Sequence, residues 1–93
     1  MLFMYINTHS VDRCMIDKPA ELAKMTADMQ AAATKAGVKI VGMYPAPHQH
    51  VVFAIVEAND LGSLELVLKP MTLWGDGELI PIMPMQELIR QNL

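Results

Sequence analysis

The chain has little of what disulfide cross-linking, nucleic-acid binding or membrane insertion requires. It contains one cysteine in 93 residues, which cannot form an internal disulfide and therefore fits a reducing compartment. Its seven lysines and arginines are scattered and its net charge is −3, so the sequence has no basic patch for nucleic acid or anionic lipid. It also lacks an apolar run of about 18 residues and a basic, signal-like start. We expect a soluble, cytoplasmic protein that binds neither nucleic acid nor membrane.

Common catalytic and phosphate-binding motifs are missing as well. The sequence has no Walker loop and no GxGxxG, GxSxG or HExxH pattern. Asp12 and Asp17 resemble calcium ligands only superficially, because their loop lacks the glycine and the distal glutamate of a calcium motif. The sequence therefore indicates function only through single residues and through the fold that brings them together.

Apolar residues are abundant. They make up 53% of the chain, whereas charged residues make up 18%, against about 25% in a typical domain. The length predicts one domain over residues 1–93, and a domain of this size buries only about 60–65% of its unfolded surface. Much apolar surface would stay exposed in a monomer, so we expect a homodimer or a higher homo-oligomer.

Apolar periodicity and turn residues predict alternating strands and helices. The first helix is expected to begin at Asp17-Lys18-Pro19 and to stop at Gly37. The second is expected to be capped by Asn59-Asp60 and to end near Pro70. Pro45 should end the second strand, and Pro81 limits the fourth to a sheet edge. The predicted strands cover residues 2–8, 38–44, 51–57 and 78–83, and a helical tail is predicted over residues 85–93.

This βαββαβ order predicts an α+β fold. Right-handed crossovers give a ferredoxin-like sandwich with an antiparallel sheet of strand order 4-1-3-2 and both helices on one face. The first and third strands are apolar on both sides, so the uncovered face needs a partner. A second copy of the sheet is the simplest cover.

The stretch GVKIVGMYPAPHQHVVFAIVEAND, followed by SLELVLKP and ELIPIMP, resembles a family of small bacterial proteins of unknown function. The shared features are the Gly-Val-Lys start, the Ala-Pro at the hairpin, the Val-Glu-Ala-Asn-Asp end and the spacing of Pro70 and Pro81, within residues 37–84. That family belongs to the dimeric α+β barrel superfamily.

Relatives in this superfamily include muconolactone isomerase-like proteins, small monooxygenases, haem-degrading enzymes, nickel-binding proteins and iron-containing sulfur oxygenase reductases. The resemblance implies a ferredoxin-like dimer and leaves the activity open, because the superfamily places different sites on one scaffold. This chain has His48-Gln49-His50 where a glycine-rich hairpin is expected.

His48 and His50 form the most specific local signal. In an extended segment their side chains would point to the same side, so that two imidazoles could approach one ion. We expect Met83 and Met85 to reach the same end of the sheet, together with Met1. Histidines with thioethers suit copper(I) or another soft metal, and nickel and iron are further candidates for the bound ion. In the alternative, the histidines are solvated and the methionines fill gaps.

Tyr5, Asn7 and His9 form a second candidate site, which we expect at the opposite end of the sheet from the first. They share one face of the first strand, and we expect them in an apolar cleft beneath the uncovered sheet face, as polar groups that orient a small hydrophobic ligand. His9 could then act as acid or base, with Glu57 or Asp60 at the same end to orient it or to help hold a metal. In the alternative, Tyr5 and Asn7 pair across a subunit interface and His9 caps the loop.

Cys14 lies in the loop that follows His9, at the same end of the sheet, and His9, Cys14 and Glu57 are the alternative metal ligands if the first candidate site holds no ion. Arg13 and the following helix start could activate the Cys14 thiolate, and the resemblance adds that iron-dependent sulfur enzymes of the superfamily use a cysteine. The competing interpretation is a small hydrophobic residue in a loop. Trp74 is the last candidate, and it could close one mouth of the cleft or anchor the dimer.

These observations favour a homodimer that binds a small ligand or a metal ion at a histidine-lined site. One alternative is a cofactor-independent monooxygenase or isomerase in which Tyr5, Asn7 and His9 orient a small hydrophobic substrate. The other is a structural or regulatory dimer without a small-molecule site. If two sheets pack antiparallel, His9 of one subunit could approach His48 of the other, and the two candidate sites would be one.

Overall fold

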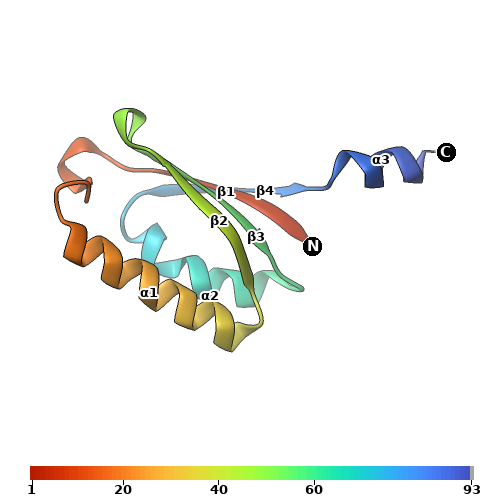
Figure 1. Ribbon diagram of the computed structural model, residues 1–93, viewed down its shortest axis with the longest axis horizontal. Helices are drawn as coiled ribbons and strands as arrows, with labels where there is room; N and C mark the ends of the chain where they lie inside the picture. Colours follow the sequence, from red (N-terminus) through yellow and green to blue (C-terminus); the bar gives the residue numbers. More distant parts are fainter. Residues whose placement is uncertain (93) are drawn as a thin grey trace.

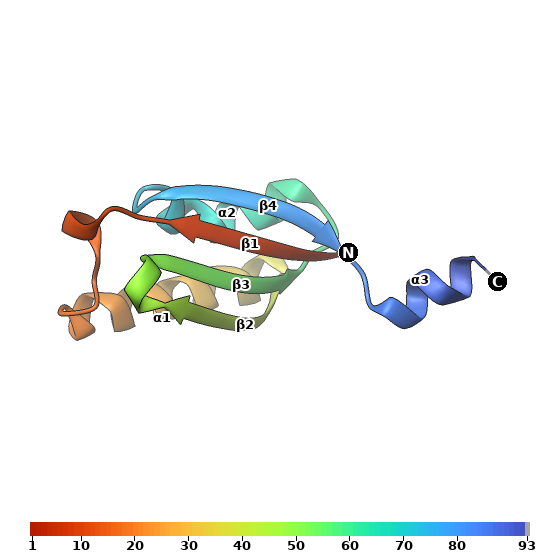
Figure 2. The ribbon, with the colours of Figure 1, turned by 90° about the horizontal axis from the view of Figure 1, so that it is seen from above.

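A computed structural model describes residues 1–92 of the chain. Four strands form one antiparallel sheet in the order β2-β3-β1-β4, and α1 and α2 lie side by side on one of its faces (Figures 1 and 2). This confirms the predicted ferredoxin-like α+β fold and its strand order. The elements are β1 (Leu2–Thr8), η1 (Val11–Arg13), α1 (Pro19–Ala36), β2 (Lys39–Ala46), η2 (Pro47–Gln49), β3 (Val51–Glu57), α2 (Leu61–Thr72), β4 (Asp76–Ile82) and α3 (Met85–Gln91).

The helices begin and end where local chemistry favours it. Pro19 opens α1, and Gly37 closes it in the left-handed conformation, with φ at 72°, which glycine adopts without steric penalty. The Asp60 carboxylate caps α2 by accepting a hydrogen bond of 2.7 Å from the Ser63 backbone N–H. The helix continues past Pro70 to Thr72.

β2 also continues past a proline. The expected stop at Pro45 is wrong, because the strand extends to Ala46 and Pro45 pairs with Val52. The reason is the position of β2 at the edge of the sheet, where a residue without a backbone N–H is tolerated.

The core lies between the sheet and the two helices. Alternate residues of β1 point toward the helices and are buried, namely Phe3, Tyr5 and Asn7. They meet the inward residues of β3 and the apolar stripes of both helices, as the strand and helix periods require. The main members of this core are Phe3, Tyr5, Met29, Ala33, Val52, Ala54, Val56, Leu64, Val67, Leu68 and Met71.

The opposite face of the sheet carries no helix of the described chain (Figure 1). Large apolar side chains are exposed on its strands: Phe53 is 37% exposed, Ile80 41%, Val41 47% and Tyr44 57%. The predicted uncovered apolar face is therefore present.

The strand register fixes which residues meet at each end of the sheet. Thr8 of β1 pairs with Val51 and with Asp76, whereas Leu2 pairs with Glu57 and Ile82. The start of β3 thus lies beside the end of β1, because the two strands are antiparallel. Three expectations are consequently wrong. Met83 and Met85 follow β4 at the far end from His48 and His50, and Glu57 and Asp60 lie at the far end from His9. His9 and His50, expected at opposite ends, lie at the same end.

The C-terminal helix α3 extends away from the sheet and the other helices (Figures 1 and 2). It confirms the predicted helical tail over Met85–Gln91, whereas Leu93 lies outside the described residues. Across residues 1–92, each helix is too short or too polar to span a bilayer.

Candidate metal site

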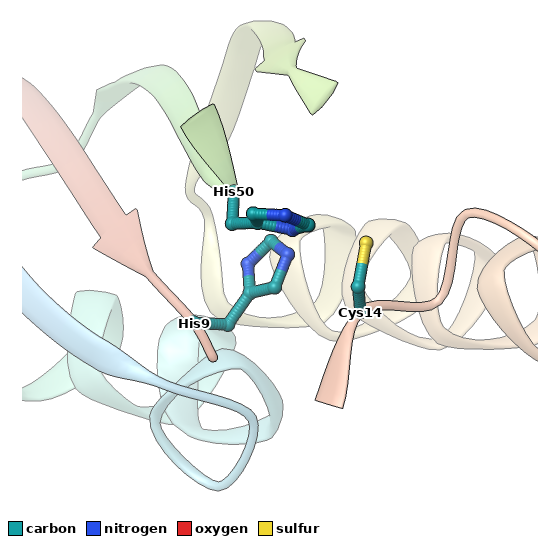
Figure 3. Close-up of side chains that lie close together, drawn as sticks. All are labelled: His9, Cys14 and His50. Atoms are coloured by element: carbon teal, nitrogen blue, oxygen red, sulfur yellow. The ribbon is translucent and has the colours of Figure 1, made fainter. Parts of the chain in front are cut away.

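Three side chains with metal-binding atoms converge at one end of the sheet. His9 follows β1, Cys14 follows η1, and His50 directly precedes β3. Their ring nitrogens and sulfur all lie within 4.8 Å of one another, and the three side chains point toward one another (Figure 3). Three segments far apart in the sequence therefore present two imidazoles and one thiol to a common point.

Strand pairing places the two histidines. The backbone N–H of His9 donates to the carbonyl oxygen of His50 at 3.0 Å, which extends the β1·β3 ladder by one residue beyond Thr8 and Val51. The imidazole centroids are consequently only 5.5 Å apart, with the ring planes at 84°. In this edge-to-face arrangement the two ring planes are nearly perpendicular, so the nitrogens of the two rings approach the space between them from different directions.

His50 has an unusual backbone conformation. Its φ is 55° and its ψ is 44°, and it is the one non-glycine residue among residues 1–92 with a positive φ. The left-handed region costs a residue with a side chain about 1–2 kcal/mol, and glycine would avoid that penalty. A strained backbone at a residue whose side chain lies beside two other potential ligands is typical of a functional position.

Trp74 and Gly75 hold the opposite side of His9. The indole stacks on the His9 ring with centroids 4.2 Å apart and planes 16° from parallel. Its N–H donates to the carbonyl oxygen of Arg13, the residue before Cys14. A Cβ at Gly75 would lie 2.9 Å from the His9 Cα, so glycine permits this close approach. Trp74 thus ties the loop that carries Cys14 to the ring of His9.

The electrostatic state of His9 favours metal binding. The residue is 8% exposed, and neither ring nitrogen has a hydrogen-bond partner within the described chain. Burial lowers the pKa of His9, and the neighbouring His50 lowers it further. Near pH 7 the ring is therefore neutral, which is the form that binds metals.

Unpaired polar atoms of this kind are uncommon in folded proteins. Most buried side-chain nitrogens and oxygens have a hydrogen-bond partner, yet His9 offers two unpaired nitrogens and His50 contributes a third, its Nδ1, among residues 1–92. A bound ligand would give atoms on both residues a partner at once. Core packing alone does not explain why these nitrogens are buried without hydrogen bonds.

An apolar cavity of about 290 Å³ adjoins the cluster. His9, Cys14 and Trp74 form part of its wall, and the rest comes mainly from the start of α1 and from β2 and β3. The lining residues are His9, Cys14, Met15, Ile16, Leu22, Met25, Thr26, Met43, Pro45, Pro47, Val51, Val52 and Trp74. A ligand in this cavity would lie beside two of the three candidate metal ligands, His9 and Cys14.

Tyr5 and Asn7 do not join this site. They face the helices rather than the uncovered face, at 4% and 0% exposure, and the Asn7 side-chain amide donates to the Met71 carbonyl oxygen at 3.0 Å. The expected cleft beneath the uncovered face is therefore wrong for these residues. Of the four residues predicted to bind a ligand, His9 and Trp74 line the cavity.

His48 also lies apart from the cluster. It is exposed within η2, a helical turn rather than the extended segment that would point it to the same side as His50. The sequence signal for the observed group was nevertheless present: His9 follows one strand and His50 precedes the strand predicted to pair with it antiparallel. The sequence also predicts Cys14 near His9, but with Glu57 as the third metal ligand, and Glu57 lies at the far end of the sheet.

A family model described as "Domain of unknown function (DUF3303)" matches residues 1–91. No curated protein matches the chain. The family match extends over β1, α1 and α3 as well as the central strands, and so includes all three residues of the candidate site.

Proposed function

Because the chain belongs to the DUF3303 family, whose description names no activity, we propose a function from the geometry: the protein binds a divalent transition-metal ion through His9, Cys14 and His50. The observation that carries this proposal is the convergence of their donor atoms within 4.8 Å of one another. His9 is only 8% exposed, and its imidazole nitrogens have no hydrogen-bond partner in residues 1–92.

The donor set selects the class of metal. Two imidazoles and one thiolate suit zinc or copper, and they do not suit magnesium or calcium, which prefer oxygen ligands. Tetrahedral zinc with bonds of about 2.0–2.3 Å needs its ligand atoms roughly 3.3–3.8 Å apart. Atoms already within 4.8 Å reach that spacing by shifts of about 1–1.5 Å, which side-chain rotation supplies. Nickel and iron also accept imidazole ligands, but the thiolate favours zinc and copper over them.

Three protein ligands leave a fourth position open. Zinc sites with three protein ligands are typical of catalysis, where the fourth position holds water or substrate. An ion held here would polarise a molecule bound in the adjoining cavity. The alternative of a cofactor-independent enzyme has less support, because Tyr5 and Asn7 are buried in the core and do not line the cavity.

We also propose that two copies pair through their uncovered sheet faces, as in the dimeric α+β barrels that the sequence resembles. The exposed apolar side chains of β2, β3 and β4 support this arrangement, since a contiguous apolar face on a small protein commonly marks an interface. The metal site lies on the other face of the sheet, so each subunit carries a complete site.

Titration with Co²⁺ tests the metal proposal. We expect one ion per chain, with a thiolate-to-cobalt charge-transfer band and the intense visible bands of a four-coordinate site. Cys14→Ser should remove the charge-transfer band, and His50→Ala should weaken binding and remove the four-coordinate spectrum. His48→Ala is the matched control, because His48 lies in the same turn but outside the cluster, and it should bind as the natural protein does. Unchanged spectra in Cys14→Ser and His50→Ala would overturn the proposal.

A further inference from the structure

We infer that the fourth position of the metal takes a small apolar molecule with one monoanionic donor group, whose apolar part fills the adjoining cavity. The inference rests on the proposed metal site and names the class of ligand that this site accepts. It is carried by the volume of the cavity, by the chemistry of its walls and by the charge of the metal centre.

The cavity has room for a substituted ring. Its volume is about 290 Å³, whereas an apolar cavity of about 150 Å³ already binds benzene. His9 and Cys14 belong to its wall, so a molecule inside it reaches the metal without any rearrangement of the fold. The space beyond the donor group accommodates an aromatic ring or a branched chain of similar size.

Beyond the second ring nitrogen of His9, the walls offer few partners for a further polar group. Within the described chain, no aspartate, glutamate, lysine or arginine lines the cavity. The Thr26 hydroxyl donates to the Leu22 carbonyl oxygen at 2.9 Å, and the Trp74 N–H donates to the Arg13 carbonyl oxygen. Because a buried polar group without a partner is destabilising, the part of the ligand that lies against the apolar walls is apolar, and its donor group lies on the metal.

Charge balance defines that polar end. A divalent ion with one thiolate and two neutral imidazoles has a net charge of +1. Such a charge is unfavourable beside apolar walls, and one monoanionic donor, such as a carboxylate or a thiolate, neutralises it. A dianion such as inorganic phosphate would leave a net negative charge beside the apolar walls.

Three probes separate these requirements. Phenylacetate carries both the ring and the anionic donor, acetate has the donor alone, and 2-phenylethanol has the ring with a neutral donor. With Co²⁺-loaded protein, we expect phenylacetate to change the visible bands and to bind about tenfold or more tightly than either control, and than it binds metal-free protein. Equal binding of phenylacetate and acetate, or equal binding with and without metal, would overturn the inference.

A cavity-filling variant adds a structural control. Met25 is partly buried and lines the cavity, so Met25→Trp should leave the Co²⁺ spectrum unchanged and weaken phenylacetate about tenfold or more. Ala23→Trp introduces the same side chain at an exposed position of the same helix, away from the cavity, and should change neither. If Met25→Trp does not fold, the three probes decide the question on the natural protein.

The two proposals fail in different ways. If no Co²⁺ binds, the metal site itself is wrong. If Co²⁺ binds with the thiolate band but phenylacetate leaves its spectrum unchanged, the metal site stands and the inferred ligand class is wrong.

Discussion

His9 is unfavourable for the stability of the metal-free protein. Its ring is buried, and its nitrogens have no hydrogen-bond partner among the described residues. Desolvating a polar group without a compensating bond costs about 1–3 kcal/mol. A metal ion at the proposed site would offset part of this cost, because coordination gives one of the two nitrogens a partner.

His9→Phe should therefore raise the unfolding free energy of the metal-free protein by about 1 kcal/mol. Phenylalanine keeps the aromatic stacking on Trp74 and removes the two nitrogens, and the adjoining cavity leaves space for the larger ring. Urea denaturation measures the difference. In saturating Zn²⁺ the order should reverse, because only the natural protein gains stability from binding. A variant less stable than the natural protein without metal would show that the His9 nitrogens have partners in solution.

The sequence indicates all three members of the site but divides them between two candidate sites. It places His9 with Cys14 at one end of the sheet and His50 with His48 at the other. The strand order was sufficient to pair His9 with His50. The loop of Cys14 was not predictable, because its position is set by the contact of Trp74 with Arg13, 61 positions apart in sequence.

Among the elements, α2 begins with an N-cap that is sensitive to pH. The backbone N–H of Ser63 lowers the pKa of Asp60, and the Ser63 hydroxyl lowers it further. A carboxylate at this position accepts an otherwise unpaired helix N–H and interacts favourably with the helix dipole.

The stability contribution of Asp60 should disappear in acid. Its folded pKa lies below the unfolded value of 3.8, so the contribution is fully present above that value and is lost as the pH falls through the folded pKa. We expect Asp60→Asn to lower the melting temperature at about pH 7, and this difference should shrink at about pH 3. A difference that stays constant with pH would show that the carboxylate charge has no role in the cap.

Most element boundaries follow from local chemistry and were predictable. The Pro19 start, the Gly37 stop and the Asp60 cap depend on neighbours in sequence, and all three are present. The irregular pairing of β2 between Ile40 and Gly42 was not predicted, because a bulge depends on the partner strand. The extension of β2 through Pro45 has the same origin, since a proline is tolerated there only by virtue of the edge position.

For the whole molecule, the uncovered sheet face is the surface through which we propose that two copies pair. Phe53 lies on this face in the central strand β3 and is 37% exposed. Leu66 is 67% exposed on α2, which lies on the other side of the sheet (Figure 1). The two side chains allow the same substitution to be compared on opposite sides of the molecule.

We expect Phe53→Asp to convert the dimer into a monomer in light scattering at micromolar concentration, because a charge buried in an apolar interface is strongly unfavourable. Leu66→Asp should remain a dimer. A monomeric mass for the natural protein, or a dimer of unchanged affinity in Phe53→Asp, would contradict pairing through this face.

The inward face of β1 could not be read from its sequence. Phe3 and Tyr5 alternate with Met4 and Ile6, so both faces are apolar and hydrophobic alternation does not decide which one meets the helices. The order of the strands was predictable from connection rules alone. Antiparallel pairing also determines which strand ends meet. It places Met83 and Met85, which follow β4, beside Met1 and away from the start of β3.

X-ray absorption spectroscopy of the Zn²⁺-loaded protein decides whether His9, Cys14 and His50 bind one ion, because it reports the atoms around that ion. We expect one sulfur at about 2.3 Å and nitrogen or oxygen neighbours at about 2.0–2.1 Å, with the multiple-scattering pattern of two imidazoles. Cys14→Ser should remove the sulfur. A first shell without sulfur, or one that keeps its sulfur in Cys14→Ser, would contradict a site formed by His9, Cys14 and His50.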